Sequence, residues 1–158
     1  MVPRQQNAQL PLFLLLGLLG VVISLQAPRH TLTPAQRFQF QHLNMAHRRC
    51  DDAMRVLNRY RRACKGENTF LHSTFADVAR VCTTTNVTCR RSSKMNCHRS
   101  SDPVPVTYCN LTRNAEDYRN CRYGQTEEPK IYIIACENRL PADNAMYSMV
   151  PVHLDGII

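Results

Sequence analysis

The sequence predicts an α+β domain, because patterns typical of helices come first along the chain and patterns typical of strands follow them. Apolar residues recur at helical spacing between residues 33 and 82. Residues 104–154 contain three runs rich in β-branched and aromatic residues. The 158 residues suffice for one domain with a modest core, and we therefore expect a single domain.

The first and third of three expected helices have clear starting signals. Thr33-Pro34 supplies a capping side chain followed by proline at the first helical position, and the helical pattern continues to about Met45. The third, shorter helix is expected to begin at Ser73 or Thr74 and to end near Cys82.

The second helix is expected from Asp51, as its cap, to Arg62. Four residues at helical spacing form its inward stripe: Ala53, Val56, Leu57 and Tyr60. The opposite face carries three arginines: Arg55, Arg59 and Arg62.

Three strands are expected in the second half of the chain, at Val104–Thr112, Lys130–Glu137 and Tyr147–Leu154. Because proline cannot donate a backbone hydrogen bond, its presence in or beside a strand predicts a sheet edge or a bend. Three prolines have such positions: Pro103, Pro105 and Pro151.

The N-terminal segment is typical of a secretory signal peptide, with one arginine before an apolar run over residues 12–23 and small or polar residues after it. The run is too short to span a bilayer, and no stop-transfer pattern follows it. We expect a signal peptide over residues 1–27, with cleavage after Ser24 or Ala27, and a mature domain over residues 28–158.

Eight cysteines follow this segment, and an even number in an exported chain predicts four disulfides. Spacing alone does not choose among the many pairings. A zinc site is the weaker interpretation, because the chain contains no CxxC pair and export favours oxidation.

The mature chain is strongly basic. Without Arg4 it holds 19 basic and 12 acidic residues, a net charge of +7, and 16 of the basic residues are arginine. Arginine grips phosphate with a planar fork, so RNA, heparin-like glycans and anionic membranes are all candidate partners on charge alone.

Two histidines and one lysine form a candidate catalytic set. His42 lies on the inward face of the first helix, His153 lies in the last strand, and Lys65 follows Cys64. A fold that joined the two imidazoles would supply a neutral ring to take a proton and a charged ring to give one. Lys65 would stabilise charge developing on a phosphate between them. Spacing alone does not establish this, since a single histidine more often has a structural or surface role.

Three segments together resemble the pancreatic-type ribonuclease family, and the resemblance covers essentially the whole mature chain and all eight cysteines. The segments are Gln41-His42, Cys64-Lys65-Gly66-Glu67-Asn68-Thr69-Phe70 and Val150-Pro151-Val152-His153-Leu154-Asp155. The eosinophil-type branch is the most similar, at Asn68–Leu71, Asn96–Ser100, Asn120–Tyr123 and Val150–Ile158.

The resemblance implies a V-shaped α+β domain of three helices and two antiparallel sheets, with the active site in the cleft between the arms. It also implies four specific disulfides, namely Cys50 to Cys109, Cys64 to Cys121, Cys82 to Cys136 and Cys89 to Cys97.

The implied reaction cleaves single-stranded RNA on the 3′ side of pyrimidines through a 2′,3′-cyclic phosphate, without a metal or another cofactor. By position, His42 is the base, His153 is the acid and Lys65 stabilises the phosphorane. Gln41 positions a phosphoryl oxygen, and Asp155 holds the imidazole of His153 in its useful tautomer.

The resemblance implies four further binding residues. Thr69 reads the pyrimidine edge, and its hydroxyl can serve cytosine or uracil. Asn96 and Glu137 contact the downstream base, and Arg90 provides a cation for a flanking phosphate.

Three departures from the family pattern bear on these subsites. The loop from Cys89 to Cys97 is one residue longer than in the pancreatic enzyme, and positions 66 and 67 hold glycine and glutamate. Leu154 replaces an aromatic residue that packs against the base, which predicts slower or less base-selective catalysis.

The same resemblance predicts a secreted monomer found outside the cell or in a secretory granule, with a role in host defence. Two sequons, at Asn86 and Asn110, predict glycans. A ribonuclease inhibitor is a further candidate partner.

An alternative function remains open from the charge. In it, the chain is a cationic antimicrobial or signalling protein whose arginines bind lipopolysaccharide, glycans or membranes independently of catalysis.

Overall fold

The computed structural model describes residues 32–158, and the predicted signal peptide over residues 1–27 lies outside the described residues. No helix within residues 32–158 is long and apolar enough to cross a membrane.

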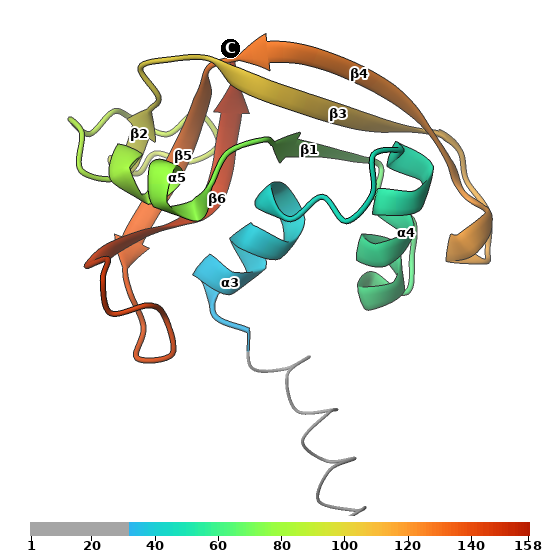
Figure 1. Cartoon of the computed structure of the whole chain (residues 1–158), viewed down its shortest axis with the longest axis horizontal. Coiled ribbons are helices and arrows are strands. Elements are labelled where there is room, and N and C mark those ends of the chain that lie inside the picture. Colours follow the sequence, from blue (N-terminus) through green and yellow to red (C-terminus); the bar gives the residue numbers. More distant parts are fainter. Residues whose placement is uncertain (1–31) are drawn as a thin grey trace, which may run out of the picture. The chain divides into compact units, whose positions relative to one another are not determined.

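The described chain has an α+β architecture, which confirms the predicted fold class (Figure 1). The α-helices are α3 (Pro34–Phe38), α4 (Cys50–Arg61) and α5 (Phe75–Val81). One antiparallel sheet has the strand order β1-β3-β4, formed by Glu67–Leu71, Val104–Arg113 and Arg122–Lys130. The other has the order β2-β5-β6, formed by Cys97–Arg99, Tyr132–Asn138 and Met149–Ile157.

Helix α3 begins as predicted and then changes geometry. Thr33 forms a capping box, in which its side chain accepts from the Gln36 backbone and the Gln36 side chain accepts from the Thr33 backbone. The chain then widens into a π-helical turn, Gln39–Leu43, and leaves helical geometry at Asn44. The helical geometry thus ends close to the expected end at about Met45, and Gln41 and His42 lie on the π turn.

Helix α4 begins two residues earlier than predicted, with Arg49 instead of Asp51 at the N-cap, Cys50 as its first residue and no capping side chain. Asp51 is not the cap because its carboxylate accepts the Tyr123 backbone N–H at 2.7 Å. The left-handed backbone of Arg62, with φ 60°, ends the helix.

The inward face of α4 differs in part from the predicted stripe. Ala53 and Leu57 are buried as expected, but Tyr60 is 37% exposed and Val56 is only partly buried. Met54 and Asn58 are fully buried in their place, because the helix is rotated about its axis relative to the predicted stripe. Asn58 is a polar residue that the apolar pattern could not select.

Helix α5 and three of the six strands agree with the sequence. Thr74 caps α5, and strands β3, β5 and β6 overlap the three predicted runs. Strands β1, β2 and β4 were missed, because β1 and β2 are short and most residues of β4 are exposed and polar.

Two of the three prolines singled out in the sequence lie within strands, one at a sheet edge and one in a central strand. Pro151 lies in edge strand β6, next to an irregularity in its pairing with β5, as predicted. Pro105 lies instead in the central strand β3, opposite Pro129 of β4. It is tolerated there because it lies past the last residue paired with β1, and its carbonyl accepts the His72 N–H at 2.9 Å.

The core connects both sheets to the helices. A cluster that includes Phe38 of α3, Val78 of α5, Leu71 of β1 and Ile134 of β5 is almost completely buried. Helix α3 packs against β6 and the π turn packs against β1. The segment that carries His42 is therefore held between the two sheets.

Four disulfides link these elements, joining Cys50 to Cys109, Cys64 to Cys121, Cys82 to Cys136 and Cys89 to Cys97. Three of them close long loops with separations of 54 to 59 residues, whereas Cys89 and Cys97 are separated by only 8. The long-range bridges constrain the unfolded chain most.

Loop length gives a testable ranking of these bridges. Replacing Cys82 and Cys136 by alanine should lower the free energy of unfolding by about 4 kcal/mol, whereas replacing Cys89 and Cys97 should lower it by about 2.5 kcal/mol. Denaturant unfolding of the two double variants checks the order, and an equal or larger loss in the short-loop variant would contradict it.

Candidate active site

A cleft with a volume of about 670 Å³ contains all three candidate catalytic residues, His42, Lys65 and His153. They come from the π turn, the segment after α4, and β6. Residues 42 and 153, which are 111 positions apart, thus line one cavity with a lysine. Both sheets contribute to the cleft walls.

The ring of His42 is oriented by a single backbone contact. Its Nδ1 lies 2.8 Å from the Thr69 carbonyl oxygen, which can only accept, so Nδ1 carries the proton in the neutral ring. The Nε2 atom then has a free lone pair. The ring also lies against Phe38, with ring centroids 5.4 Å apart.

Burial lowers the pKa of His42 from 6.5 to about 4. The hydrogen bond to Thr69 opposes this shift, while the positive charges of Lys65, His153 and Arg91 add to it. His42 is therefore neutral, and able to accept a proton, over the whole neutral pH range.

The ammonium of Lys65 is linked to the His42 segment through one side chain. Lys65 Nζ donates to Asn68 Oδ1 at 2.7 Å, and Asn68 Nδ2 donates to the Gln41 carbonyl at 2.8 Å. Burial and the charges of Arg61 and Arg91 lower the pKa of Lys65, whereas Glu67 raises it.

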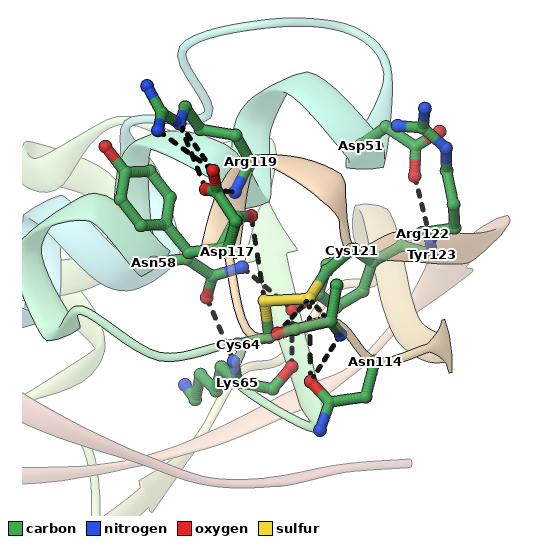
Figure 2. Close-up of a disulfide and its surroundings, with 12 residues drawn as sticks. Asp51, Asn58, Cys64, Lys65, Asn114, Asp117, Arg119, Cys121, Arg122 and Tyr123 are labelled. Carbon is green, nitrogen blue, oxygen red and sulfur yellow. Dashed lines mark hydrogen bonds and ion pairs between the residues drawn. A yellow bond between two sulfur atoms is a disulfide. The ribbon is translucent and has the colours of Figure 1, made fainter.

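The backbone of Lys65 is fixed on both sides (Figure 2). Its N–H donates to Asn58 Oδ1 at 2.9 Å, and its carbonyl accepts from the Tyr123 hydroxyl at 2.6 Å. Asn58 Nδ2 also donates to the Tyr123 hydroxyl at 3.0 Å, which closes the arrangement. The Cys64–Cys121 disulfide is next to Lys65 in the chain, so three groups hold the backbone of Lys65 in place: Asn58, Tyr123 and this disulfide.

The carboxylate of Asp155 binds the backbone of a neighbouring loop. Its buried carboxylate accepts the backbone N–H groups of Arg90, at 2.7 Å, and of Arg91, at 3.0 Å. Among the described residues it makes no hydrogen bond to His153. A buried carboxylate is satisfied by two N–H groups from successive residues, so Asp155 holds the loop between Cys89 and Cys97 to β6.

The candidate base reader Thr69 lines the cleft on β1, opposite Tyr108 of β3. The Tyr108 hydroxyl donates to the Glu67 carboxylate at 2.6 Å, and this hydrogen bond raises the pKa of Tyr108. Sequence reasoning missed Tyr108, because only the pairing of β1 with β3 shows that it is next to Thr69.

The flanking residues are less central than expected. Asn96 Nδ2 donates to the Cys136 carbonyl at 3.0 Å, and Glu137 follows Cys136 on β5, so the two lie close together. Neither of them lines the main cleft, and neither does Arg90. Arg91 does line it, and sequence reasoning missed this residue.

Two other histidines are structural. His72 Nε2 lies 2.6 Å from the Thr107 hydroxyl, and the buried His98 contacts the Thr84 carbonyl through Nδ1 at 2.9 Å. Both histidines thus have the structural role that is more common for a single histidine than a catalytic one.

Within residues 32–158, one group has the composition of a metal site, Cys89, Cys97 and Asp155. Its two sulfurs are joined in a disulfide, and Asp155 already accepts two N–H groups. This group does not fit a cation.

The two sequons differ in accessibility. Asn86 is exposed in the segment between α5 and β2. Asn110 lies in the central strand β3, half-buried, with its amide directly over Gly124, where an added Cβ would be 2.6 Å from Asn110 Oδ1.

A sequence model of the family described as pancreatic ribonuclease matches residues 33–155, which include every residue of the cleft up to Asp155. The chain belongs to this family. It is 49% identical over 152 residues to mouse "Ribonuclease 2B", with 96% of each chain covered. It is also 48% identical over 157 residues to mouse "Non-secretory ribonuclease", with 99% of each chain covered.

Family membership and these relatives establish that the chain is a ribonuclease, and the cleft with two histidines and a lysine is its candidate active site. The family that the sequence motifs predicted is confirmed.

The clamp on Lys65 generates a testable prediction. Tyr123→Phe removes the hydrogen bond to the Lys65 carbonyl and the acceptor for Asn58, so stability should fall by about 1–2 kcal/mol. Loosening Lys65 should also lower kcat by about tenfold with little change in KM. Tyr147→Phe is the matched control, since Tyr147 packs edge-on against Phe75 away from the cleft. Equal effects of the two variants on kcat, measured below both melting temperatures, would contradict the role of the clamp.

Proposed function

We propose that this ribonuclease cleaves single-stranded RNA on the 3′ side of pyrimidines by transphosphorylation, using the 2′-hydroxyl as nucleophile. The observation that carries the proposal is the presence of His42, Lys65 and His153 in one cleft, with the Nε2 atom of His42 free to accept a proton. The substrate supplies its own nucleophile, and no step calls for a metal.

In the first step His42 Nε2 takes the proton of the 2′-hydroxyl, and O2′ attacks phosphorus. The bond from phosphorus to O5′ breaks, and His153 gives a proton to O5′, leaving a 2′,3′-cyclic phosphate. Water then opens this product, with the two histidines exchanging roles.

Lys65 stabilises the extra negative charge of the pentacoordinate phosphorane. Burial and neighbouring cations destabilise the charged form of Lys65 in the free enzyme. The negative charge of a bound phosphate therefore interacts strongly and favourably with its ammonium group. Gln41 also lines the cleft and is the candidate for orienting a phosphoryl oxygen.

Thr69 is the candidate pyrimidine reader. Its hydroxyl makes no hydrogen bond to a described protein group, lies in the cleft, and can donate or accept. Tyr108 and Glu67 form the adjacent wall. We assign the flanking positions to Arg90 for a phosphate and to Asn96 with Glu137 for the downstream base.

We also propose that residues 1–27 are a signal peptide and that the enzyme is a secreted monomer acting in host defence. Four disulfides and an exposed sequon at Asn86 support export.

The pH dependence of cleavage tests the catalytic assignment. Because burial lowers the pKa of His42 to about 4, the base stays neutral until the pH falls to about 4, and activity should decline only below that value. On the alkaline side activity should fall, because a general acid must carry a proton to protonate O5′. Dinucleotide cleavage measured from about pH 3 to 9, a range that includes the acid limb, should therefore be asymmetric and bell-shaped.

The matched variants for this measurement are His42→Ala and His153→Ala, which should lower kcat by about 10²–10⁴-fold. His72→Ala serves as a histidine control, since His72 contacts Thr107 outside the catalytic set. Full RNA cleavage by both catalytic variants would show that the site is wrongly assigned.

A second candidate function, binding to polyanionic surfaces, is favoured by a groove on α4. The groove has a volume of about 540 Å³, and its charged lining residues are Asp52, Arg55, Arg59 and Arg119, the last of which is paired with Asp117. Arg55 and Arg59 have the same charge one helical turn apart and no ion pair among the described residues, which is mildly unfavourable without an anion.

This second function is separable from catalysis. His42→Ala should keep full binding to immobilised heparin, whereas Arg55→Gln with Arg59→Gln should elute at lower salt. Arg99→Gln with Arg113→Gln removes the same charge from exposed positions elsewhere. Equal elution of the two double variants would show that net charge, not the groove, governs binding.

A further inference from the structure

Arg91 lies in the same cleft as His42, Lys65 and His153. It comes from the loop between Cys89 and Cys97, which lies outside the three segments that contain the catalytic residues. A cation from a third part of the chain therefore meets the catalytic residues.

The base of the Arg91 side chain is held in place. Its backbone N–H and that of Arg90 both donate to the buried Asp155 carboxylate, at 3.0 and 2.7 Å. The Cys89–Cys97 disulfide and a hydrogen bond from Cys89 N–H to the Lys94 carbonyl close the loop. Asp155 is two residues after His153 on β6, so the same strand positions the candidate acid and the loop.

Arg91 and Arg90 leave this anchor in different directions. The Arg90 side chain lies along Gly156, where an added Cβ would be 3.4 Å from Arg90 Cδ, and Arg90 does not line the cleft. Of these two adjacent arginines, only Arg91 is therefore placed to meet a phosphate between the histidines.

The charge of Arg91 has no counterion in the described chain. Four other cations form ion pairs with carboxylates, namely Arg49, Arg80, Arg119 and Lys130, and Arg91 is in none of them. Its charge instead helps to lower the pKa of His42, together with the charges of Lys65 and His153. It also helps to lower the pKa of Lys65. This accumulation of positive charge is unfavourable until an anion enters.

We propose that Arg91 is a third cationic group of the catalytic centre, which binds a nonbridging oxygen of the phosphate being transferred, beside Lys65. The proposal rests on the transphosphorylation proposed above. The reacting phosphate gains a negative charge as it becomes pentacoordinate, so a guanidinium whose backbone is anchored beside it stabilises the transition state more than the substrate. Its planar donors also match two phosphate oxygens. Asp155 is then a positioning residue for Arg91.

A substrate with a single phosphate tests this assignment directly. Arg91→Gln should lower kcat on the dinucleotide UpA by about 10–100-fold, with a smaller change in KM, and Arg91→Lys should recover part of the loss. Lys94→Gln is the matched control because it removes one charge from the exposed part of the same loop, and it should keep wild-type kcat.

The pH profile separates a catalytic role from a structural one. Without the Arg91 charge, His42 should hold its proton slightly more strongly, so the acid limb of Arg91→Gln should move to higher pH, by a small amount because burial, the largest cause of the low pKa, remains. The other groups that act on His42, the Thr69 carbonyl, Lys65 and His153, are unchanged in this variant. Lys94→Gln should leave the limb in place.

Two results would overturn the proposal. Wild-type kcat for Arg91→Gln on UpA, with a loss only on the 5′-phosphorylated substrate pUpA, would assign Arg91 to a flanking phosphate. Unchanged kcat on both substrates would remove Arg91 from catalysis. Failure of the wild type to cleave UpA would instead refute the proposed function, so the two failures are distinguishable.

Discussion

The arrangement of the active site depends on how the chain is fixed at Lys65. Asn58 and Tyr123 bind its backbone on both sides, and the adjacent Cys64–Cys121 disulfide ties it to the start of β4. From this point a chain of hydrogen bonds passes through Asn68 to the Gln41 carbonyl. The next residue, His42, is hydrogen-bonded to β1 through the Thr69 carbonyl. Lys65, His42 and Thr69 are therefore linked by hydrogen bonds and backbone, so that displacement of one residue disturbs the others.

The free cleft is electrostatically unsatisfied. Burial and the charges of Lys65, His153 and Arg91 lower the pKa of His42, and burial with the charges of Arg61 and Arg91 lowers that of Lys65, which Glu67 in the cleft only partly offsets. The disulfides and the core supply the stability that tolerates this cost. A phosphate that enters the cleft relieves it, and a phosphorane with one more negative charge relieves it further. Substrate binding and transition-state stabilisation thus have the same physical origin.

Local signals and motifs predicted much of this structure, and long-range pairing explains what they missed. Thr33 and Thr74 were recognisable caps because capping acts within one turn, and His42, Lys65 and His153 were identified by motif. Strand β4 was invisible because most of its residues are exposed and polar, and the π turn has no apolar signature. Arg91 was missed for a different reason. Two adjacent arginines look alike until the fold shows which one faces the cleft.

The central claim is that this cleft cleaves RNA through the substrate's own 2′-hydroxyl without a metal. The most direct measurement follows the products of UpA cleavage by phosphorus NMR in the presence of a chelator. We predict that uridine 2′,3′-cyclic phosphate accumulates first and is then converted to the 3′-monophosphate. Direct formation of a monophosphate without the cyclic species, or loss of cleavage in the chelator, would contradict the account.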